Sequence, residues 1–461
     1  MELKLPEIIE RSIPSLRKLV GDVDKVALIN VLNAKLANMI TQTGANFKQY
    51  SNSKPAVLSY YGINFMISGS SKDYSVDCVN NYLIPFVEEE LRSKIEEYKN
   101  DYYEEHIINA KTASQKNKVE KEVQEIRVAN YELHNPNCTG LYKEAEQIAK
   151  IKFGSLFIRI GEFGDYLDSI VGNNNSSKKE LYQKLKEIYE GTIAPSIIAG
   201  DGKREVLKNI PVQVLIYTDF DNLYDERIKK YYVGSMKTGQ ARRCFTYMPL
   251  DKNRKIGYPV HPEVKNEAIF ELLGLQKEYK KIFDTLNSLP ADDKTFYLSG
   301  EAQDYLYDYN CRCIDYFNES KDDVIIRLEK KESFWKITKL AVIYGILDNP
   351  KCRTIKKEHV MMAESFYRLI EPSLKTVLNE REKTVVEKFA EFMFNKCVEN
   401  RFVTRTELRK ANYIKDKTFA KEFDKMLPEI EDELKEVYKC YLLDYEGNKN
   451  TKGYQIRLME E

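Results

Sequence analysis

The sequence predicts an α/β protein with a parallel-sheet core that carries a phosphate-binding loop, a helical lid, and a C-terminal winged-helix domain. Three apolar segments rich in β-branched and aromatic residues are separated by helical stretches, which is typical of a parallel sheet. The first segment runs into a loop of small residues that ends at Lys72. Residues 380–461 combine three helical patterns with a β-hairpin, as winged-helix domains do.

Length and charge limit the possible function classes. The chain has 461 residues and 43% hydrophobic content, enough for a sizeable core. Lys plus Arg and Asp plus Glu both total 72, so any nucleic-acid surface must be a local patch. Apolar runs are short and interrupted by charges, and no signal peptide is visible, so we expect a cytoplasmic protein without membrane contact.

Periodicity and composition divide the chain into four expected parts. They are an N-terminal helical segment at 1–50, a core at 51–260, a helical lid at 261–379 and a winged-helix domain at 380–461. Inside the core, residues 87–130 are highly charged with two thin apolar stripes, which predicts a helical hairpin that turns near 112–115. The hairpin is either a solvated helix pair or an arm that contacts a neighbouring subunit or partner.

The first strand, predicted within residues 55–67, leads into a possible phosphate-binding loop. The backbone amides of such a loop surround the phosphates, and its lysine neutralises their charge. In this sequence the loop is formed by Gly69, Ser70 and Ser71, and the lysine is Lys72. The pattern departs from a standard loop at Met66, Ser71 and Asp73. The Asp73 carboxylate either binds Mg²⁺ directly or repels a triphosphate. A strand-to-helix turn without phosphate chemistry is the alternative.

The second and third strands end in residues suited to ATP chemistry. Residues 155–160 are followed by Gly161 and Glu162, and an ATPase needs a carboxylate at this point to activate water. Glu162 is the candidate, although it would also suit a helix cap, and Gly161 stands where a magnesium-holding aspartate is usual. Thr218, at the end of the third strand, is placed to sense a γ-phosphate.

Two consecutive arginines, Arg242 and Arg243, follow a turn that contains Gly239. Arginine contacts to a γ-phosphate across a subunit boundary stabilise the transition state. Surface arginines without a role are the alternative interpretation. The order of the candidates along the chain is more informative than any one of them.

In this order of motifs the chain resembles the P-loop proteins of phages, plasmids and prophages that are related to replicative helicases of the AAA+ type. The likeness spans about residues 20–375 and includes Thr139-Gly140-Leu141 and the segment Phe334–Tyr344. It implies ATP and Mg²⁺ as cofactors, with Lys336 or Lys339 as the nucleotide sensor of the lid. It also implies a homo-oligomeric ring, usually a hexamer, that acts on DNA together with replication or phage proteins.

The predicted winged-helix domain carries its own basic residues. Its third helix is expected at 416–434 and its hairpin strands at 438–444 and 453–458. Lysines near that helix and on the wing would bind DNA phosphates: Lys415, Lys417, Lys421, Lys425, Lys449 and Lys452. The acidic stretch 429–436 favours the alternative, a module for protein contacts.

Three functional hypotheses follow from the sequence. The first is a ring-forming, helicase-like ATPase or an ATP-binding remnant of one, acting on DNA in the replication of a mobile element. The second is a non-catalytic assembly or adaptor protein, which the departures at Met66, Ser71, Asp73 and Gly161 favour. The third is an origin-binding protein that uses the winged helix.

Overall fold

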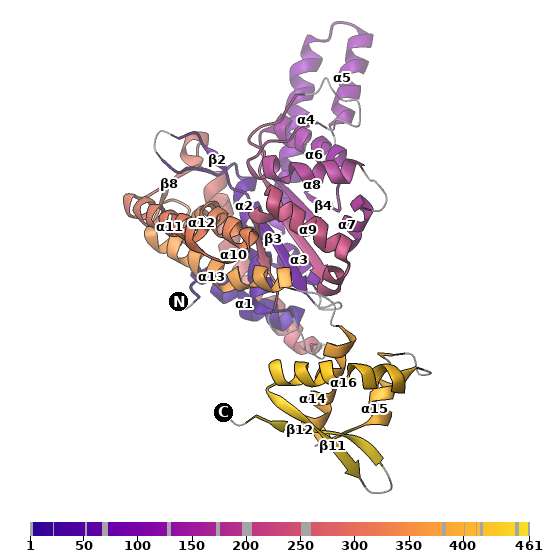
Figure 1. Cartoon of the computed structure of the whole chain (residues 1–461). Coiled ribbons are helices and arrows are strands. Elements are labelled where there is room, and N and C mark those ends of the chain that lie inside the picture. Colours follow the sequence, from indigo (N-terminus) through magenta and orange to yellow (C-terminus); the bar gives the residue numbers. More distant parts are fainter. Residues whose placement is uncertain are drawn as a thin grey trace. The chain divides into compact units, whose positions relative to one another are not determined.

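The computed structural model separates the chain into two compact units, residues 1–380 and residues 381–461 (Figure 1). The structure describes residues 3–21, 23–50, 53–66, 72–126, 131–171, 176–195, 205–249, 260–379, 384–400, 402–411, 413–414, 418–447 and 451–459. The expected N-terminal segment, core and lid all fall in the first unit. The second unit begins within two residues of the expected start of the last domain.

A five-stranded parallel sheet forms the centre of the first unit, in agreement with the predicted α/β class. The strands lie in the order β4 (Glu132–His134), β5 (Leu156–Ile160), β6 (Val212–Asp219), β3 (Tyr61–Met66) and β7 (Cys244–Tyr247). Met66 pairs with Asp219 and Tyr61 pairs with Cys244. Because every pair is parallel, the carboxyl ends of the strands meet at one edge of the sheet and the amino ends at the other.

Helices cover both faces of this sheet, and the alternation along β3 shows how. The Asn30 Nδ2 of α2 (Lys25–Gln42) donates to Asn64 Oδ1 at 2.8 Å, whereas the next residue, Phe65, packs edge-on against Tyr232 of α9 (Glu226–Thr238). Successive side chains of a strand point to opposite faces. Strands buried on both faces read as continuous apolar runs, which explains why β3, β5 and β6 are visible in the sequence.

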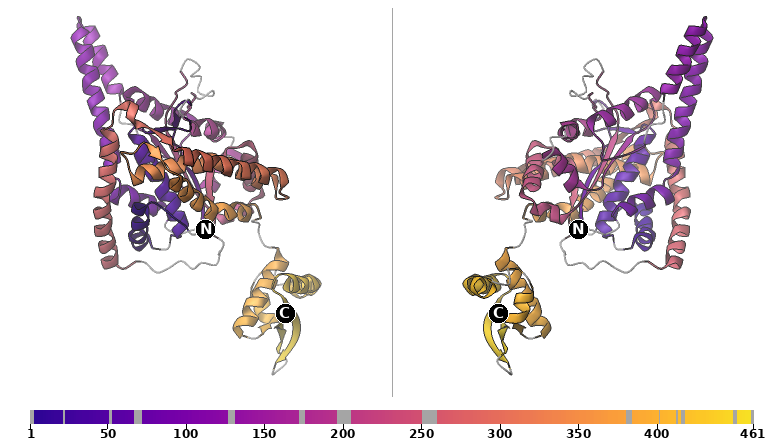
Figure 2. Two further views of the ribbon diagram at one scale, coloured as in Figure 1. Left: turned by 90° about the vertical axis from the view of Figure 1, so that its left-hand side faces the viewer. Right: turned by 90° about the vertical axis from the view of Figure 1, so that its right-hand side faces the viewer.

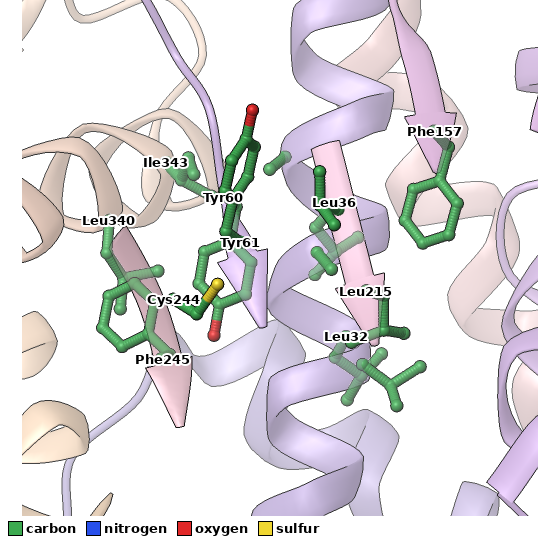
Figure 3. Close-up of a cluster of buried hydrophobic side chains, with 14 of the residues drawn as sticks. Leu32, Leu36, Tyr60, Tyr61, Phe157, Leu215, Cys244, Phe245, Leu340 and Ile343 are labelled. Atoms are coloured by element: carbon green, nitrogen blue, oxygen red, sulfur yellow. The ribbon is translucent and has the colours of Figure 1, made fainter. Parts of the chain in front are cut away.

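The core of the first unit continues from the sheet into the helices expected as a lid. Leu32 and Leu36 of α2 lie beside Leu215 of β6, and Leu340 and Ile343 lie near Phe245 on the other side of the view (Figure 3). One buried cluster runs from Leu5 to Val377. These helices are α1 (Glu7–Val20), α10 (Pro262–Asn287), α11 (Gly300–Glu319), α12 (Val324–Asp348) and α13 (Lys357–Asn379).

A second, smaller sheet was not predicted. It joins strands from distant parts of the chain in the order β2 (Ala56–Val57), β1 (Asn46–Lys48), β8 (Thr295–Leu298) and β9 (Thr354–Ile355). The apolar run at 55–67 therefore contributes to two sheets rather than one strand. Short 3-10 turns complete the unit at η1 (Phe220–Tyr224), η2 (Ala241–Arg243) and η3 (Ala291–Lys294).

The charged segment forms a helical hairpin that stands out from the rest of the first unit (Figure 2). It consists of α4 (Phe86–Asn109) and α5 (Ala113–Glu125), and Thr112 caps α5 in a capping box with Gln115. The remaining helices of the unit are α3 (Lys72–Tyr82), α6 (Cys138–Ile151), α7 (Phe163–Val171) and α8 (Ser176–Tyr189). Across the described ranges, every helix is too short or too polar to cross a membrane.

In its described residues, the second unit contains three helices and a three-stranded antiparallel sheet. The helices are α14 (Val385–Asn400), α15 (Arg405–Lys410) and α16 (Phe419–Glu436), and the strands lie in the order β10 (Val403–Thr404), β12 (Thr451–Leu458) and β11 (Cys440–Gly447). Thr404 caps α15 and forms a capping box with Glu407. Aromatic rings of Phe389, Phe419 and Phe423 pack together in its core.

Candidate functional site

Two of the predicted site residues, Asp73 and Thr218, lie at the carboxyl edge of the parallel sheet, as does Gly161. Asp73 is in the first turn of α3, Gly161 directly follows β5, and Thr218 lies near the end of β6. A Cβ atom at Gly161 would lie 3.4 Å from Asp73 Oδ1, so these two positions face each other. The Tyr217 and Ser75 hydroxyls are 3.1 Å apart and join β6 to α3. In open α/β sheets, ligands bind beyond the carboxyl ends of the strands.

The segment predicted to form a phosphate-binding loop falls outside the residues that the structure describes. Gly69, Ser70 and Ser71 belong to the undescribed segment 67–71. Lys72 is the first residue of α3, but its side chain is not described. Its backbone is therefore placed at the start of a helix that follows β3, as the phosphate-loop hypothesis requires.

Thr218 and Glu162 differ in exposure. Thr218 is buried and its Oγ1 accepts a hydrogen bond from Asn222 Nδ2 at 3.1 Å. A Cβ at Gly164 would overlap the Asn222 side chain, so the glycine leaves space for this amide. Glu162 is exposed, and its backbone carbonyl accepts from Tyr166 N at 3.0 Å in the first turn of α7. Glu162 therefore lies at the same edge of the sheet, one residue beyond Gly161.

A buried arginine connects Asp73 to the sheet. Arg159 of β5 is only 5% exposed, and its guanidinium contacts Asp73 Oδ1 at 3.1 Å and Asp77 Oδ1 at 2.7 Å. The same group bonds Glu132 Oε1 at 3.0 Å, and Lys35 Nζ lies 3.1 Å from Glu132 Oε2. Two cations thus face three carboxylates, which leaves one negative charge. Sequence reasoning missed Arg159, although a single arginine inside the apolar run LFIRI signals a buried partner.

The charges of this network shift the pKa of Glu132. Burial alone would raise the pKa of this carboxyl group. The Lys35 ammonium, a hydrogen bond from Asn80 Nδ2 at 2.9 Å and the Arg159 guanidinium outweigh burial and lower the pKa to about 2. Glu132 therefore stays ionised at all physiological pH values. The network is a fixed charged support beneath Asp73.

The residues at the carboxyl edge fit a Mg²⁺ ion that is held mainly by phosphate oxygens. Mg²⁺ commonly takes one or two protein carboxylates and completes its shell with water and phosphate. Asp73 is half exposed, and among the described residues Arg159 contacts its Oδ1. No group of three or more metal-ligating side chains occurs within the described ranges.

Arg242, Arg243, Lys336 and Lys339 lie at the opposite, amino edge of the sheet. Lys336 Nζ donates to the carbonyl oxygen of Cys244 at 3.1 Å, and Cys244 pairs with Tyr61 at the start of β3. From Tyr61 to Met66 the strand rises by roughly 16 Å, at ~3.3 Å per residue. The structure therefore does not bring these four residues together with Asp73 and Thr218. The physical reason is that the two arginines precede β7, and residues that precede a strand lie at its amino end.

The two lid lysines are buried in different electrostatic surroundings. Lys336 forms an ion pair with Glu329, which also accepts from the Tyr367 hydroxyl at 2.6 Å. Lys339 Nζ donates to the carbonyl oxygen of Tyr189 at 2.8 Å and lies 3.6 Å from the centre of the Tyr189 ring. Burial lowers the pKa of Lys339 to about 7, and the nearby Arg243 adds to this effect while Glu190 opposes it.

The basic residues of the second unit are only partly described. Lys421 and Lys425 are exposed and lie one turn apart on α16, and Lys452 is exposed on β12. Lys415, Lys417 and Lys449 lie outside the described residues. The second half of α16 is acidic, with Glu429, Glu431, Asp432, Glu433 and Glu436. The two described helix lysines thus stand at the basic end of a helix with mixed charge.

Comparison of the chain with protein-family models and with curated proteins finds no match. The choice of function therefore depends on the geometry given above. That geometry contains two separate groups of charged side chains in the first unit, one at each edge of the parallel sheet.

Proposed function

We propose that the first unit binds ATP with Mg²⁺ at the carboxyl edge of its parallel sheet. On this proposal the protein is a ring-forming, helicase-like ATPase of the AAA+ type that acts on DNA in the replication of a phage or other mobile element. One observation carries it: the start of α3 at Lys72, the Asp73 carboxylate, Gly161 and Thr218 converge at one edge. A helix that begins at this edge favours phosphate binding through its free amides and dipole.

Each residue of the edge has a specific role in this proposal. Lys72 and the loop of Gly69, Ser70 and Ser71 would hold the phosphates, and Asp73 would hold Mg²⁺, which neutralises phosphate charge when bound. Glu162 would orient the attacking water. Thr218, fixed by Asn222, would contact the γ-phosphate.

Two departures from the standard ATPase pattern are explained together if the metal-binding carboxylate stands at position 73 and not at position 161. These two positions are neighbours in the structure. A carboxylate at 161 would stand next to the Asp73 carboxylate, because even a Cβ there approaches Asp73 Oδ1 to 3.4 Å. Two like charges at such a distance repel each other. A glycine at 161 therefore suits a protein whose metal-binding carboxylate comes from the helix. On this view the two departures are one coupled change.

The ion pair of Asp73 with Arg159 favours a second candidate, a non-catalytic protein that keeps the fold. A guanidinium 3.1 Å from the carboxylate already neutralises part of its charge. Such a site would bind nucleotide as a structural ligand, or none, and would serve assembly. Arg242 and Arg243, at the amino edge, would then take no part in the ATP site of their own subunit.

The decisive experiment measures steady-state ATP turnover and nucleotide binding by the full chain and three variants. Lys72→Ala should abolish both, whereas Glu162→Gln should keep binding and lose turnover. Lys281→Ala, an exposed lysine of α10, is the matched control. Turnover that is unaffected by Lys72→Ala would refute the assignment. Binding without turnover in the unchanged protein would favour the adaptor, and mass photometry with and without ATP would then test for rings.

A DNA-binding role of the second unit rests on its predicted winged-helix arrangement and its exposed lysines. We expect the double variant Lys421→Ala, Lys425→Ala to weaken DNA binding and to reduce its salt dependence, since each phosphate contact contributes to the salt slope. A gel-shift series of the full chain across salt concentrations measures both. Lys435→Ala, in the acidic half of α16, is the control. Absence of any shift at low salt would remove DNA from the proposal, and footprinting on the origin would test the third hypothesis.

A further inference from the structure

A cavity of about 470 Å³ opens at the amino edge of the parallel sheet, away from the proposed ATP site. Its walls come from the segment before β2, the end of α8, the turn η2 and one face of α12. Its lining includes Lys54, Tyr189, Arg243, Glu332, Trp335 and Lys339. Its volume falls within the range of small-ligand pockets.

Two buried cations line this cavity, Lys339 and Arg243, and each makes few hydrogen bonds within the described residues. An ammonium group has three donors, and one donor of Lys339 is used on the Tyr189 carbonyl. Among the described residues, no carboxylate lies within 4.0 Å of Lys339 Nζ. Arg243 donates to Gly239 O at 2.7 Å and reaches Glu190 only at 3.5 Å, and the Glu190 side chain is 65% exposed. Burying a charged group without a counter-ion costs folding free energy, and an anionic ligand would offset this cost for a buried cation.

Lys336 shows by contrast what a structural lysine in this region looks like. It lines the same cavity but is neutralised by Glu329 and bonded to the Cys244 carbonyl. Lys339, one turn further along α12, has no such partner in the described ranges. The difference between the two lysines indicates that Lys339, together with Arg243, is suited to bind an anionic ligand, and that Lys336 is not.

Aromatic rings complete the cavity. Tyr189 is a buried wall, and Trp335 at the rim leaves 43% of its surface exposed. Nucleic-acid bases stack on exposed aromatic rings with a gain in binding energy. Trp335 is also the only tryptophan in the chain, so its fluorescence reports on this cavity.

We propose that this amino-edge cavity binds a nucleoside phosphate, with the phosphate between Arg243 and Lys339 and the base against Trp335. The site is distinct from the proposed ATP site and does not depend on it. The nucleoside phosphate is either a free nucleotide or a nucleotide of a single-stranded nucleic acid, since both present the same phosphate and base. Lys54, exposed at the rim, adds a further positive charge toward the ligand.

Binding should weaken as pH rises through 7, because the cavity loses the Lys339 charge. Burial sets the pKa of Lys339 near 7, and an anion beside it favours the protonated form. The charged groups that face Lys339 come from all surrounding elements: Glu190, Arg243, Glu332, Lys336 and Lys54. Above pH 7 a phosphate monoester, with its second pKa of about 6, is almost fully ionised, so the ligand charge changes little from pH 7 upward.

The test is a titration of Trp335 fluorescence in the full chain, with AMP as the free nucleotide and an oligothymidylate as the strand. We expect a saturable change with at least one of the two, weakened at least tenfold by Lys339→Met and at least twofold by Lys54→Met. Lys281→Met, the same change at an exposed position of α10, and Lys72→Ala should leave the titration unchanged. The AMP and oligothymidylate arms show which source is preferred.

Three results would overturn the proposal. One is no fluorescence change with either ligand. Another is equal titration of the unchanged protein, Lys339→Met and Lys54→Met. The last is loss of the signal in Lys72→Ala, which would place the ligand at the carboxyl edge. The Lys54→Met variant keeps the test valid if Lys339→Met alters the fold, because Lys54 is exposed. Failure of ATP turnover leaves this test unaffected, so the two proposals fail separately.

Discussion

Replacing Arg159 by methionine should destabilise the first unit more than any change at its surface. The methionine fills similar space but removes the guanidinium that contacts Asp73, Asp77 and Glu132. Glu132 would remain buried with Lys35 as its remaining cation. An uncompensated carboxylate in the interior is the expected source of the lost stability.

The magnitude can be obtained in two ways. Breaking a buried ion pair by removal of one partner typically costs ~3–5 kcal/mol. The pKa of Glu132, lowered from 4.5 to about 2, corresponds to roughly 3 kcal/mol of preference for the ionised form. Arg159 supplies only part of that preference, because Lys35 and Asn80 contribute too. We therefore expect a loss of about 3 kcal/mol.

The assay is urea unfolding of the full chain followed by circular dichroism at several pH values. Because the folded pKa of Glu132 is depressed, its contribution is complete above about pH 4.5 and lost as pH falls toward 2, so the deficit of the variant should shrink in that interval. Arg227→Met removes an exposed pair with Asp225 and should leave the midpoint unchanged. An Arg159→Met protein that unfolds like the unchanged one at neutral pH would refute the reasoning.

Three further substitutions test other parts of the structure. Lys339→Met should raise the stability of the first unit by ~3–5 kcal/mol at pH 7, because the pKa of Lys339 falls from 10.5 in the unfolded chain to about 7 on folding. Between about pH 7 and 10.5 the unfolded chain binds more protons than the folded one. The unchanged protein should therefore gain stability in urea unfolding as pH rises through this interval, and the variant should not. Gly453→Ala would place a Cβ 2.3 Å from the Val403 carbonyl oxygen and should lower the stability of the second unit by ~1–3 kcal/mol. Limited proteolysis should then cleave residues 381–461 faster. An unchanged cleavage rate would contradict this prediction. Gly164→Ala should displace Asn222 from Thr218 and weaken ATP binding several-fold by equilibrium dialysis, whereas Gly234→Ala, which meets open space, should bind like the unchanged protein.

The sequence was informative about the fold where burial is continuous. The runs LFIRI and VQVLIY are apolar because both of their faces are covered, and both became strands of the central sheet. β4 carries only one apolar residue, Leu133, and β7 is four residues long, so neither gave a periodic signal. The pairing of β1 with β8 joins residues 46–48 to 295–298, and no local pattern encodes such a contact.

The same contrast holds for the functional residues. Asp73, Gly161 and Thr218 follow strands that were visible in the sequence, so their common edge could be predicted. Arg242 and Arg243 precede β7, which was not visible, and their edge of the sheet could not be known. Whether a lysine of α12 is paired, like Lys336, or unpaired within the described part, like Lys339, depends on residues from other elements.

The strand order has a consequence for how this protein is made. β3 ends at residue 66 but lies between β6 and β7, and β7 begins at residue 244. At ~5–20 residues per second, a ribosome needs on the order of 10–40 s to produce the residues in between. Until residue 219 has been made β3 has neither of its neighbours, and from then until β7 is made it has only β6. The nascent chain should therefore be a strong client of ribosome-associated chaperones until β7 has left the exit tunnel.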